Sequence, residues 1–290
     1  LQQYHPNGGL TIMELAFDLG TVAKRKAYIQ QASNVRSQIR AANAENILVT
    51  ISNHSEESTG DLFLGKQRQK DVAATTLECL LTPFAAEIEG AMLCLLACGW
   101  VIQYTENFDA LRDAVGRFRF SSTIAFDAPR FQPFMTWPFL VRIIEATFVE
   151  GHAIEAAVPH ALAYSGRLGQ HTGVYIMTPC PTSLATQQVI HTTKYVWSHR
   201  NHRPWGETLP LQCPQCGALK MWSPARYVSG TYIFHCRHPR CGRDAVTGAF
   251  VKKAVTYKFK KPDNVEVLSK GKTDAWAWLR MQLPQRVVEM

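Results

Sequence analysis

Eight cysteines divide the 290-residue chain into two regions with different chemistry. Four of them form two close pairs in the last third of the chain: Cys213, Cys216, Cys236 and Cys241. Each pair lies in a short turn followed by glycine, CPQCG and CRHPRCG, and glycine eases the backbone curl that directs two sulfurs inward. Two such pairs can surround one tetrahedral ion, so the sequence predicts one structural Zn²⁺ held by these four thiolates.

Four cysteine ligands leave no open coordination position, so the expected ion contributes to folding and not to catalysis. His235 and His238 are nearby substitute ligands, but the cysteine set is complete without them. The same segment is rich in basic residues, with aromatic residues between them. This mixture suits nucleic-acid binding, and the alternative is a solvated basic face over a small core. The basic residues are Lys220, Arg226, Arg237, Arg240, Arg243, Lys252, Lys253, Lys258, Lys260 and Lys261.

A cysteine and a histidine in the first region could perform a second chemistry. Cys98 follows an apolar run at 91–97, and His54 lies three residues after the run ILVTI at 47–51. A thiol is a useful nucleophile only as thiolate, and an imidazole can take its proton and later return it to a leaving amine. The two residues are therefore candidates for a catalytic dyad.

The surroundings of Cys98 bear on that hypothesis. Gly99 would let a substrate backbone approach closely, and the N–H of Cys98 could stabilise an oxyanion. The alternative is that Cys98 is a buried, inert thiol and His54 a solvated loop residue. Cys94 lies in the middle of the same run and is expected to serve packing alone.

Alternating helix and strand patterns must position these residues. Strands are predicted at 47–51, 61–64, 91–97, 122–126 and 173–178, and helices at 10–44, 72–89 with a break at Pro83, 108–118, and 133–163 as one long or two short helices. Buried strands between helices imply a mainly parallel sheet covered on both faces. Function gathers at the carboxyl ends of such strands, which directs attention to His54, Cys98 and Asp127. Asp127 is expected either to shape a substrate pocket or to cap the following helix.

The order of these motifs resembles the caspase-like cysteine peptidases, and most closely their CHAT (caspase and separase-like) branch. The resemblance covers roughly residues 12–178 and rests on SNHSEESTGDLFL, LLACG and FD after three strands, and on FVEGHAIEAAVPHALA in a late helix. It implies an α/β/α sandwich with a mainly parallel sheet. It also implies a cysteine endopeptidase in which Cys98 is the nucleophile and His54 the general base and then acid.

One position departs from that family. The family commonly has glycine directly after the histidine, where its backbone N–H helps to form the oxyanion hole. This chain has Ser55, whose N–H remains available but whose Cβ occupies space where substrate passes. The alternative to a peptidase is a non-catalytic caspase-like scaffold whose zinc ribbon binds nucleic acid or protein.

The length, the charge and the cysteine positions limit how the chain can be divided into domains. The predicted parts are a caspase-like domain at 1–185, a linker at 186–207, a small β-rich zinc ribbon at 208–262 and a tail at 263–290 that packs on the body. The net charge of +8 permits nucleic-acid contact without requiring it. The expected partners are a protein or peptide substrate and nucleic acid.

No membrane partner is expected, because the longest apolar run, 91–102, is shorter than the roughly 20 residues that span a bilayer. Reduced cysteines are the default reading, which favours an intracellular location, cytoplasmic or nuclear. The chain begins with Leu1, and the first strand of the family is not evident before residue 12, so we expect a fragment or a processed product.

Overall fold

The structure is a computed structural model that describes residues 8–67, 70–74, 77–181, 186–244, 246–270 and 275–289. The chain forms two compact units, Leu1–Lys194 with Gln282–Met290, and Tyr195–Met281. The α-helices among the described residues are α1 (Val22–Ala42), α2 (Glu78–Leu81), α3 (Trp100–Gln103), α4 (Thr105–Arg117), α5 (Pro133–Ile144), α6 (Ile154–Ala163) and α7 (Gly166–His171). The short 3₁₀ helices η2 (Thr82–Phe84) and η4 (Pro204–Gly206) and the π-helix η3 (Glu145–Val149) complete the helical elements.

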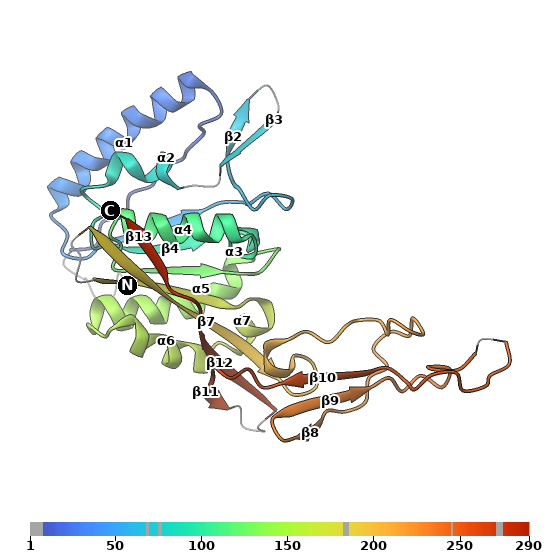
Figure 1. Ribbon diagram of the computed structural model, residues 1–290. Coiled ribbons are helices and arrows are strands. Elements are labelled where there is room, and N and C mark those ends of the chain that lie inside the picture. The colour runs from blue at the N-terminus through green and yellow to red at the C-terminus, as the bar shows by residue number, and fades with distance from the viewer. Residues whose placement is uncertain are drawn as a thin grey trace. The chain divides into compact units, whose positions relative to one another are not determined.

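The described strands fall in both units (Figure 1). They are β1 (Leu48–Ser52), β2 (Leu62–Gln67), β3 (Lys70–Ala74), β4 (Met92–Leu96), β5 (Ser122–Phe126), β6 (Val174–Pro181), β7 (Gln187–His199), β8 (Arg226–Val228), β9 (Thr231–His235), β10 (Thr256–Lys260), β11 (Val265–Lys270), β12 (Trp276–Gln282) and β13 (Arg286–Glu289).

The first unit is built on a mixed sheet with the strand order β1-β4-β5-β6-β7, in which β13 also pairs with β7. The expected parallel arrangement holds for β1, β4 and β5. It does not extend further, because β6 runs antiparallel to β5 and β13 antiparallel to β7. Three helices, α5, α6 and α7, lie between β5 and β6, and they return the chain to the edge at which β5 ends. There the N–H of Gly173, just before β6, donates to the side chain of Asp127, just after β5.

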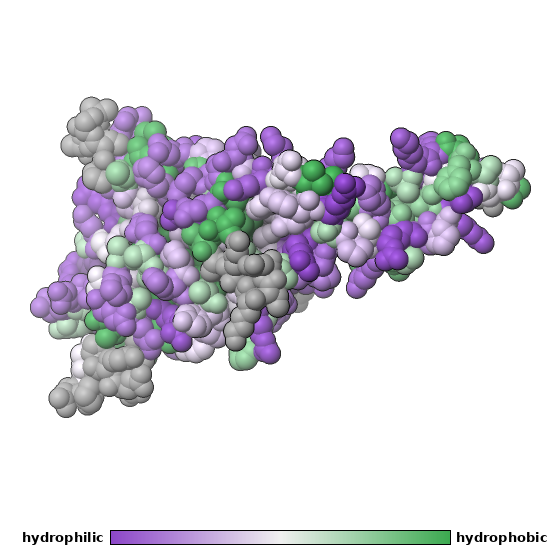
Figure 2. Space-filling view, turned by 90° about the horizontal axis from the view of Figure 1, so that it is seen from below, coloured by the Kyte–Doolittle hydropathy of each residue, from purple (hydrophilic) through white to green (hydrophobic). Residues whose placement is uncertain are grey.

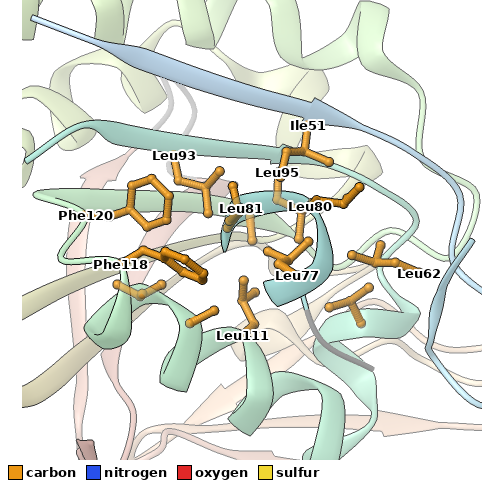
Figure 3. Packing of buried hydrophobic residues seen from close by; sticks show 14 of the residues in the cluster. Ile51, Leu62, Leu77, Leu80, Leu81, Leu93, Leu95, Leu111, Phe118 and Phe120 are labelled. Carbon is orange, nitrogen blue, oxygen red and sulfur yellow. The ribbon is translucent and has the colours of Figure 1, made fainter. Parts of the chain in front are cut away.

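Helices cover both faces of this sheet (Figure 1). On one face Leu93 and Leu95 of β4 pack in a core cluster with Leu111 of α4 and with residues of α1 and α2 (Figure 3). On the other face the ring of Phe126 in β5 meets that of Phe139 in α5 edge to face, with their centroids 6.5 Å apart. The first unit is therefore an α/β structure with apolar strands buried between helices, as the sequence predicts.

Two predicted helices are shorter than expected. The helix predicted within 10–44 begins at Val22, because the Thr21 side chain caps it by accepting the N–H of Lys24, and it ends at Asn43 in the left-handed conformation. The prediction of a helix at 72–89 is wrong at both ends, since β3 extends to Ala74 and pairs with β2, and the helical residues of α2 and η2 end at Phe84. Residues 75 and 76 of that prediction lie outside the described residues.

The segment 186–207, predicted to be a linker, contains strand β7, so residues 187–199 are part of a sheet and not a linker. Its run of β-branched and aromatic residues suits a pleated strand, and Ile190, Thr192 and Tyr195 are buried. The predicted tail at 263–290 is likewise divided. Strands β11 and β12 pair with each other in the second unit up to Met281, and β13 joins the sheet of the first.

The second unit contains a three-stranded antiparallel sheet, β10-β9-β8. Its apolar core brings together Val196, Trp205, Val265 and Leu279. A separate buried cluster is formed by the paired cysteines. In the described part of the chain, no helix has both the length and the hydropathy needed to cross a membrane.

Candidate functional site

The register of two parallel strands places His54 beside Cys98. Ser52, the last residue of β1, pairs with Leu96, the last residue of β4. The ladder continues one step further, because the N–H of Asn53 donates to the carbonyl oxygen of Leu96 at 3.1 Å. Since both chains then advance two residues from the paired positions, His54 and Cys98 leave the sheet side by side.

The two side chains point toward each other at the edge of the sheet, within the longest hydrogen-bond distance to sulfur. The Sγ atom of Cys98 lies 4.0 Å from Nδ1 of His54, at the outer limit of a hydrogen bond to sulfur. His54 is exposed and Cys98 is half-buried, so both are open to solvent. Among the described residues the imidazole of His54 has no other hydrogen-bond partner, so none of them orients the ring as a third member.

Cys94 shows what a cysteine of the same run looks like without access to solvent. It lies in the middle of β4 and is 3% exposed. Burial raises the pKa of its thiol to about 12, so it stays protonated at neutral pH. Two cysteines four residues apart thus have different environments, and only Cys98 combines a solvent-open thiol with a neighbouring base.

Two backbone N–H groups beside the dyad are available for an oxyanion. Ser55 faces Leu62 in an antiparallel bridge, but the residues beside them make the hydrogen bonds of this bridge. The N–H of Glu56 donates to the carbonyl oxygen of Asp61, and the N–H of Phe63 donates to that of His54. No hydrogen bond from the N–H of Ser55 or of Cys98 to another described residue is recorded. The N–H of Gly99, by contrast, donates to the carbonyl oxygen of Ala128 at 2.7 Å.

Gly99 lies in close contact with the backbone of Asp127. A Cβ on Gly99 would lie 2.0 Å from the main-chain carbon of Asp127, so glycine is required there for packing. The carboxylate of Asp127 accepts hydrogen bonds from the N–H of Gly173 at 2.6 Å and the hydroxyl of Tyr175 at 3.3 Å. It caps no helix, since the cap of α5 is Gln132. Asp127 therefore joins the end of β5 to the start of β6.

Sequence reasoning missed two residues that hold the loop carrying His54. The hydroxyl of Tyr104 donates to the carbonyl oxygen of Glu57 at 2.9 Å, and the amide of Asn107 donates to the carboxylate of Asp61 at 3.0 Å. Asn107 is 4% exposed. The available signal was its position four residues before Leu111 on the apolar face of a helix, where a buried polar residue needs a specific partner.

The four paired cysteines come together in the second unit and could hold a metal ion. The Sγ atoms of Cys213 and Cys241 are 3.7 Å apart, as are those of Cys216 and Cys236. All four sulfurs lie within 4.8 Å of one another. A tetrahedron with Zn–S bonds of ~2.3 Å has edges of about 3.8 Å, so the donor set has the dimensions of a zinc site.

Local backbone geometry and electrostatics favour a cation at this cluster. Gly217 follows the first pair with φ +69°, and Gly242 follows the second with φ +81°, a conformation that glycine adopts without strain. A Cβ on Gly242 would also meet the carbonyl oxygen of Lys252 at 2.2 Å. Burial raises the pKa of the thiols of Cys236 and Cys241. At Cys213, by contrast, burial is outweighed by hydrogen bonds from the backbone N–H groups of Cys216 and Gln215, which lower the pKa of its thiol to about 7. A cation among the sulfurs would favour the thiolate form of all of them.

Comparison with known proteins yields no relative for this chain: no family description, no curated protein and no solved structure matches it.

Proposed function

We propose that the first unit is a cysteine endopeptidase of the caspase-like fold, nearest its CHAT branch, in which Cys98 is the nucleophile and His54 the general base. The observation that carries the proposal is the 4.0 Å separation of Cys98 Sγ and His54 Nδ1 at the ends of two paired parallel strands. Catalytic hydrogen bonds are often long without substrate and tighten in its complex. A solvent-open thiol beside an imidazole is the arrangement that peptide-bond hydrolysis through a thioester needs.

The proposed reaction uses these two side chains twice. His54 takes the thiol proton of Cys98, and the thiolate attacks the scissile carbonyl carbon. The C–N bond then breaks, the leaving amine takes the proton from the imidazolium, and a thioester remains. Water next attacks the thioester while His54 takes its proton. The C–S bond breaks, the thiolate regains a proton, and a carboxylic acid is released.

The oxyanion of each tetrahedral intermediate would accept hydrogen bonds from the N–H groups of Cys98 and Ser55. Both groups lack a recorded partner among the described residues, so binding the oxyanion displaces no internal hydrogen bond. Donors already fixed by the fold stabilise developing charge without reorganisation. The N–H of Gly99 has no such role, since Ala128 already accepts it.

The proposal gives the second unit a structural zinc ribbon. Its support is a set of four sulfurs with tetrahedral spacing, contributed by two turns that flank strands β8 and β9. If Zn²⁺ is bound, the ion supplies folding energy by joining these turns, and four thiolates leave it no position for a substrate. The proposal includes a reducing, intracellular setting, in which the thiolates of these four cysteines stay available to the ion.

A thiol-reactive peptide probe tests the peptidase. The intact protein is incubated with a library of peptidyl acyloxymethyl ketones, and the modified cysteine is located by mass spectrometry. Labelling of Cys98 that depends on the peptide portion, and that His54→Ala reduces at least tenfold, is the expected result. Cys98→Ala should abolish both labelling and peptide cleavage.

The opposite outcome would favour the alternative. If Cys98 reacts no faster than an ordinary exposed thiol and its rate is unchanged in His54→Ala, the dyad has no catalytic function. The first unit would then be a non-catalytic caspase-like scaffold. Exposed Cys180 provides the reference rate within the same molecule.

A further inference from the structure

The positive charge of the chain is concentrated in residues 208–262 of the second unit. This segment holds ten Lys and Arg residues against one acid, Asp244, a net charge of +9. The remaining residues hold 21 Lys and Arg against 22 Asp and Glu, a net charge of −1. A Zn²⁺ ion with four thiolates would contribute −2 and still leave +7. Charge asymmetry of this size within one chain indicates an anionic partner for the segment.

The register of the β10-β9-β8 sheet separates its aromatic and basic side chains. Phe259 of β10 pairs with Tyr232 of β9, which pairs with Tyr227 of β8. On this face the rings of Phe259 and Phe234 meet edge to face at 5.8 Å and Tyr232 packs against the core of the unit, while Tyr227 is 56% exposed. The rings that alternate with basic residues in the sequence are therefore not available together with them for stacking on bases.

The opposite face of the same sheet carries the cations. Lys258 pairs with Ile233, which pairs with Arg226, and Lys260 pairs with Thr231, so these side chains lie on one face. Arg226, Lys258 and Lys260 are exposed. The described residues show no ion pair for any of the three. None of the strand residues on this face is acidic. We call it the basic sheet face; its residues are Arg226, Val228, Thr231, Ile233, His235, Thr256, Lys258 and Lys260.

We propose that the basic sheet face binds the phosphate backbone of a nucleic acid without reading its sequence. Unpaired lysine and arginine side chains beside threonine hydroxyls are the groups that contact phosphates. Lys258 and Lys260 lie about 6.7 Å apart along the strand, a spacing similar to that of neighbouring phosphates. The aromatic rings of the sheet lie on its opposite face, so the contact on the basic sheet face is with the backbone and not with stacked bases.

An anionic membrane is the other surface that such charge could meet, and the structure favours it less. Apolar side chains able to enter a bilayer are exposed elsewhere in the unit, at Val246 (94%), Phe250 (73%) and Val251 (65%). Figure 2 shows hydrophobic residues gathered at the surface of the tip of this unit. These residues belong to the loop before β10 and not to the basic sheet face. The inference does not depend on the peptidase activity.

The test measures binding of the complete chain to fluorescein-labelled single-stranded and duplex DNA by anisotropy over a series of KCl concentrations. We expect a Kd in the micromolar range at low salt that weakens steeply as salt rises. K258Q/K260Q should reduce the slope of log K against log [KCl] by about 1.4 on single strands and about 1.8 on duplex, and do so equally for different sequences.

A matched control separates this surface from net charge alone. Lys26 and Arg167 are exposed residues of the first unit, and K26Q/R167Q removes the same charge. This control should leave the slope unchanged, and circular dichroism should show both variants folded. Equal losses in the two variants would overturn the proposal. So would binding of the wild-type chain to neither DNA, or binding only to vesicles that contain phosphatidylserine.

Discussion

The hydroxyl of Ser55 donates a hydrogen bond of 2.8 Å to the main-chain carbonyl oxygen of Cys98. This contact joins the residue after His54 to the residue that bears the thiol, so it ties the two strand ends that carry the dyad. Glycine at this position could not make the bond. In the proposed peptidase, the serine that stands where caspase-like peptidases commonly have glycine would therefore help to position the thiol.

Ser55→Ala should weaken both the unit and the site. Loss of one partly buried hydrogen bond costs about 1 kcal/mol, which lowers the midpoint of thermal unfolding by about 2–4 °C in a unit of this size. Because the Cys98 carbonyl loses its anchor, we expect the rate of Cys98 labelling by the peptide probe to fall about threefold to tenfold. Ser58→Ala, in the same exposed loop, is the control. Equal labelling rates in both variants would show that the bond does not position the thiol.

The buried amide of Asn107 leads to a prediction with a distinctive pH dependence. Asn107→Asp places a second carboxylate beside Asp61, and two carboxylates at this distance raise the pKa of one of them. A shared proton can restore the contact at low pH and is lost as pH rises. Labelling of Cys98 in this variant, relative to wild type, should therefore be closer to normal at pH 5 than at pH 8. A defect that is the same at both values would mean that Asn107 serves packing alone.

Sequence patterns located the strands around the site well, because these strands are short, apolar and bounded by polar turns. The run at 122–126 is strand β5 with the predicted bounds, and every residue of it is buried. The runs at 47–51 and 91–97 became β1 and β4, which carry His54 and Cys98 at their ends. An apolar run followed by a polar turn is a local signal, and tertiary contacts did not alter it.

Features that depend on contacts between residues far apart in the sequence could not be predicted from local patterns. Strand β7 was missed because Gln187–His199 mixes polar and apolar residues, and its pairing with β13 joins segments far apart in the sequence. The direction of β6 depends on where α5 and α6 return the chain. The contact of Gly99 with Asp127 and the bond from Ser55 to Cys98 likewise exist only once the strands are side by side.

Cys94 and Cys98 should differ sharply in reactivity and in their effect on stability. Burial raises the pKa of Cys94 to about 12, so iodoacetamide at pH 8 should leave Cys94 unmodified while Cys98 reacts. Cys94→Ala should destabilise the unit by about 1 kcal/mol through loss of a buried sulfur and spare the labelling of Cys98. Peptide mapping and thermal unfolding measure the two effects. Modification of Cys94 in folded protein would contradict its burial.

The lowered pKa of the Glu87 carboxyl predicts that the first unit loses stability in acid. Burial tends to raise its pKa, but hydrogen bonds from Arg36 and Arg40 outweigh this and hold the pKa of the carboxyl below its usual value of 4.5. A lowered pKa stabilises the folded state above the unfolded value, and that stabilisation is lost as pH falls towards the folded value. Glu87→Gln should therefore lower the urea midpoint at pH 7 and have a smaller effect at pH 3. An equal effect at both pH values would exclude the ionised carboxylate as the cause.

The last prediction separates the metal centre from the dyad. Purified protein should contain one Zn²⁺ per chain, and Cys213→Ser should lose it, because three thiolates and a hydroxyl bind far more weakly than four thiolates. The second unit should then unfold, since the ion joins two turns that few apolar contacts hold, while Cys98 in the first unit should still react with the peptide probe. Cys180→Ser removes an exposed cysteine outside the cluster and should retain the metal. Metal analysis, limited proteolysis and probe labelling on the same samples distinguish the outcomes. Full zinc content in Cys213→Ser would refute the four-cysteine site, and loss of probe labelling together with zinc would show that the two centres depend on each other.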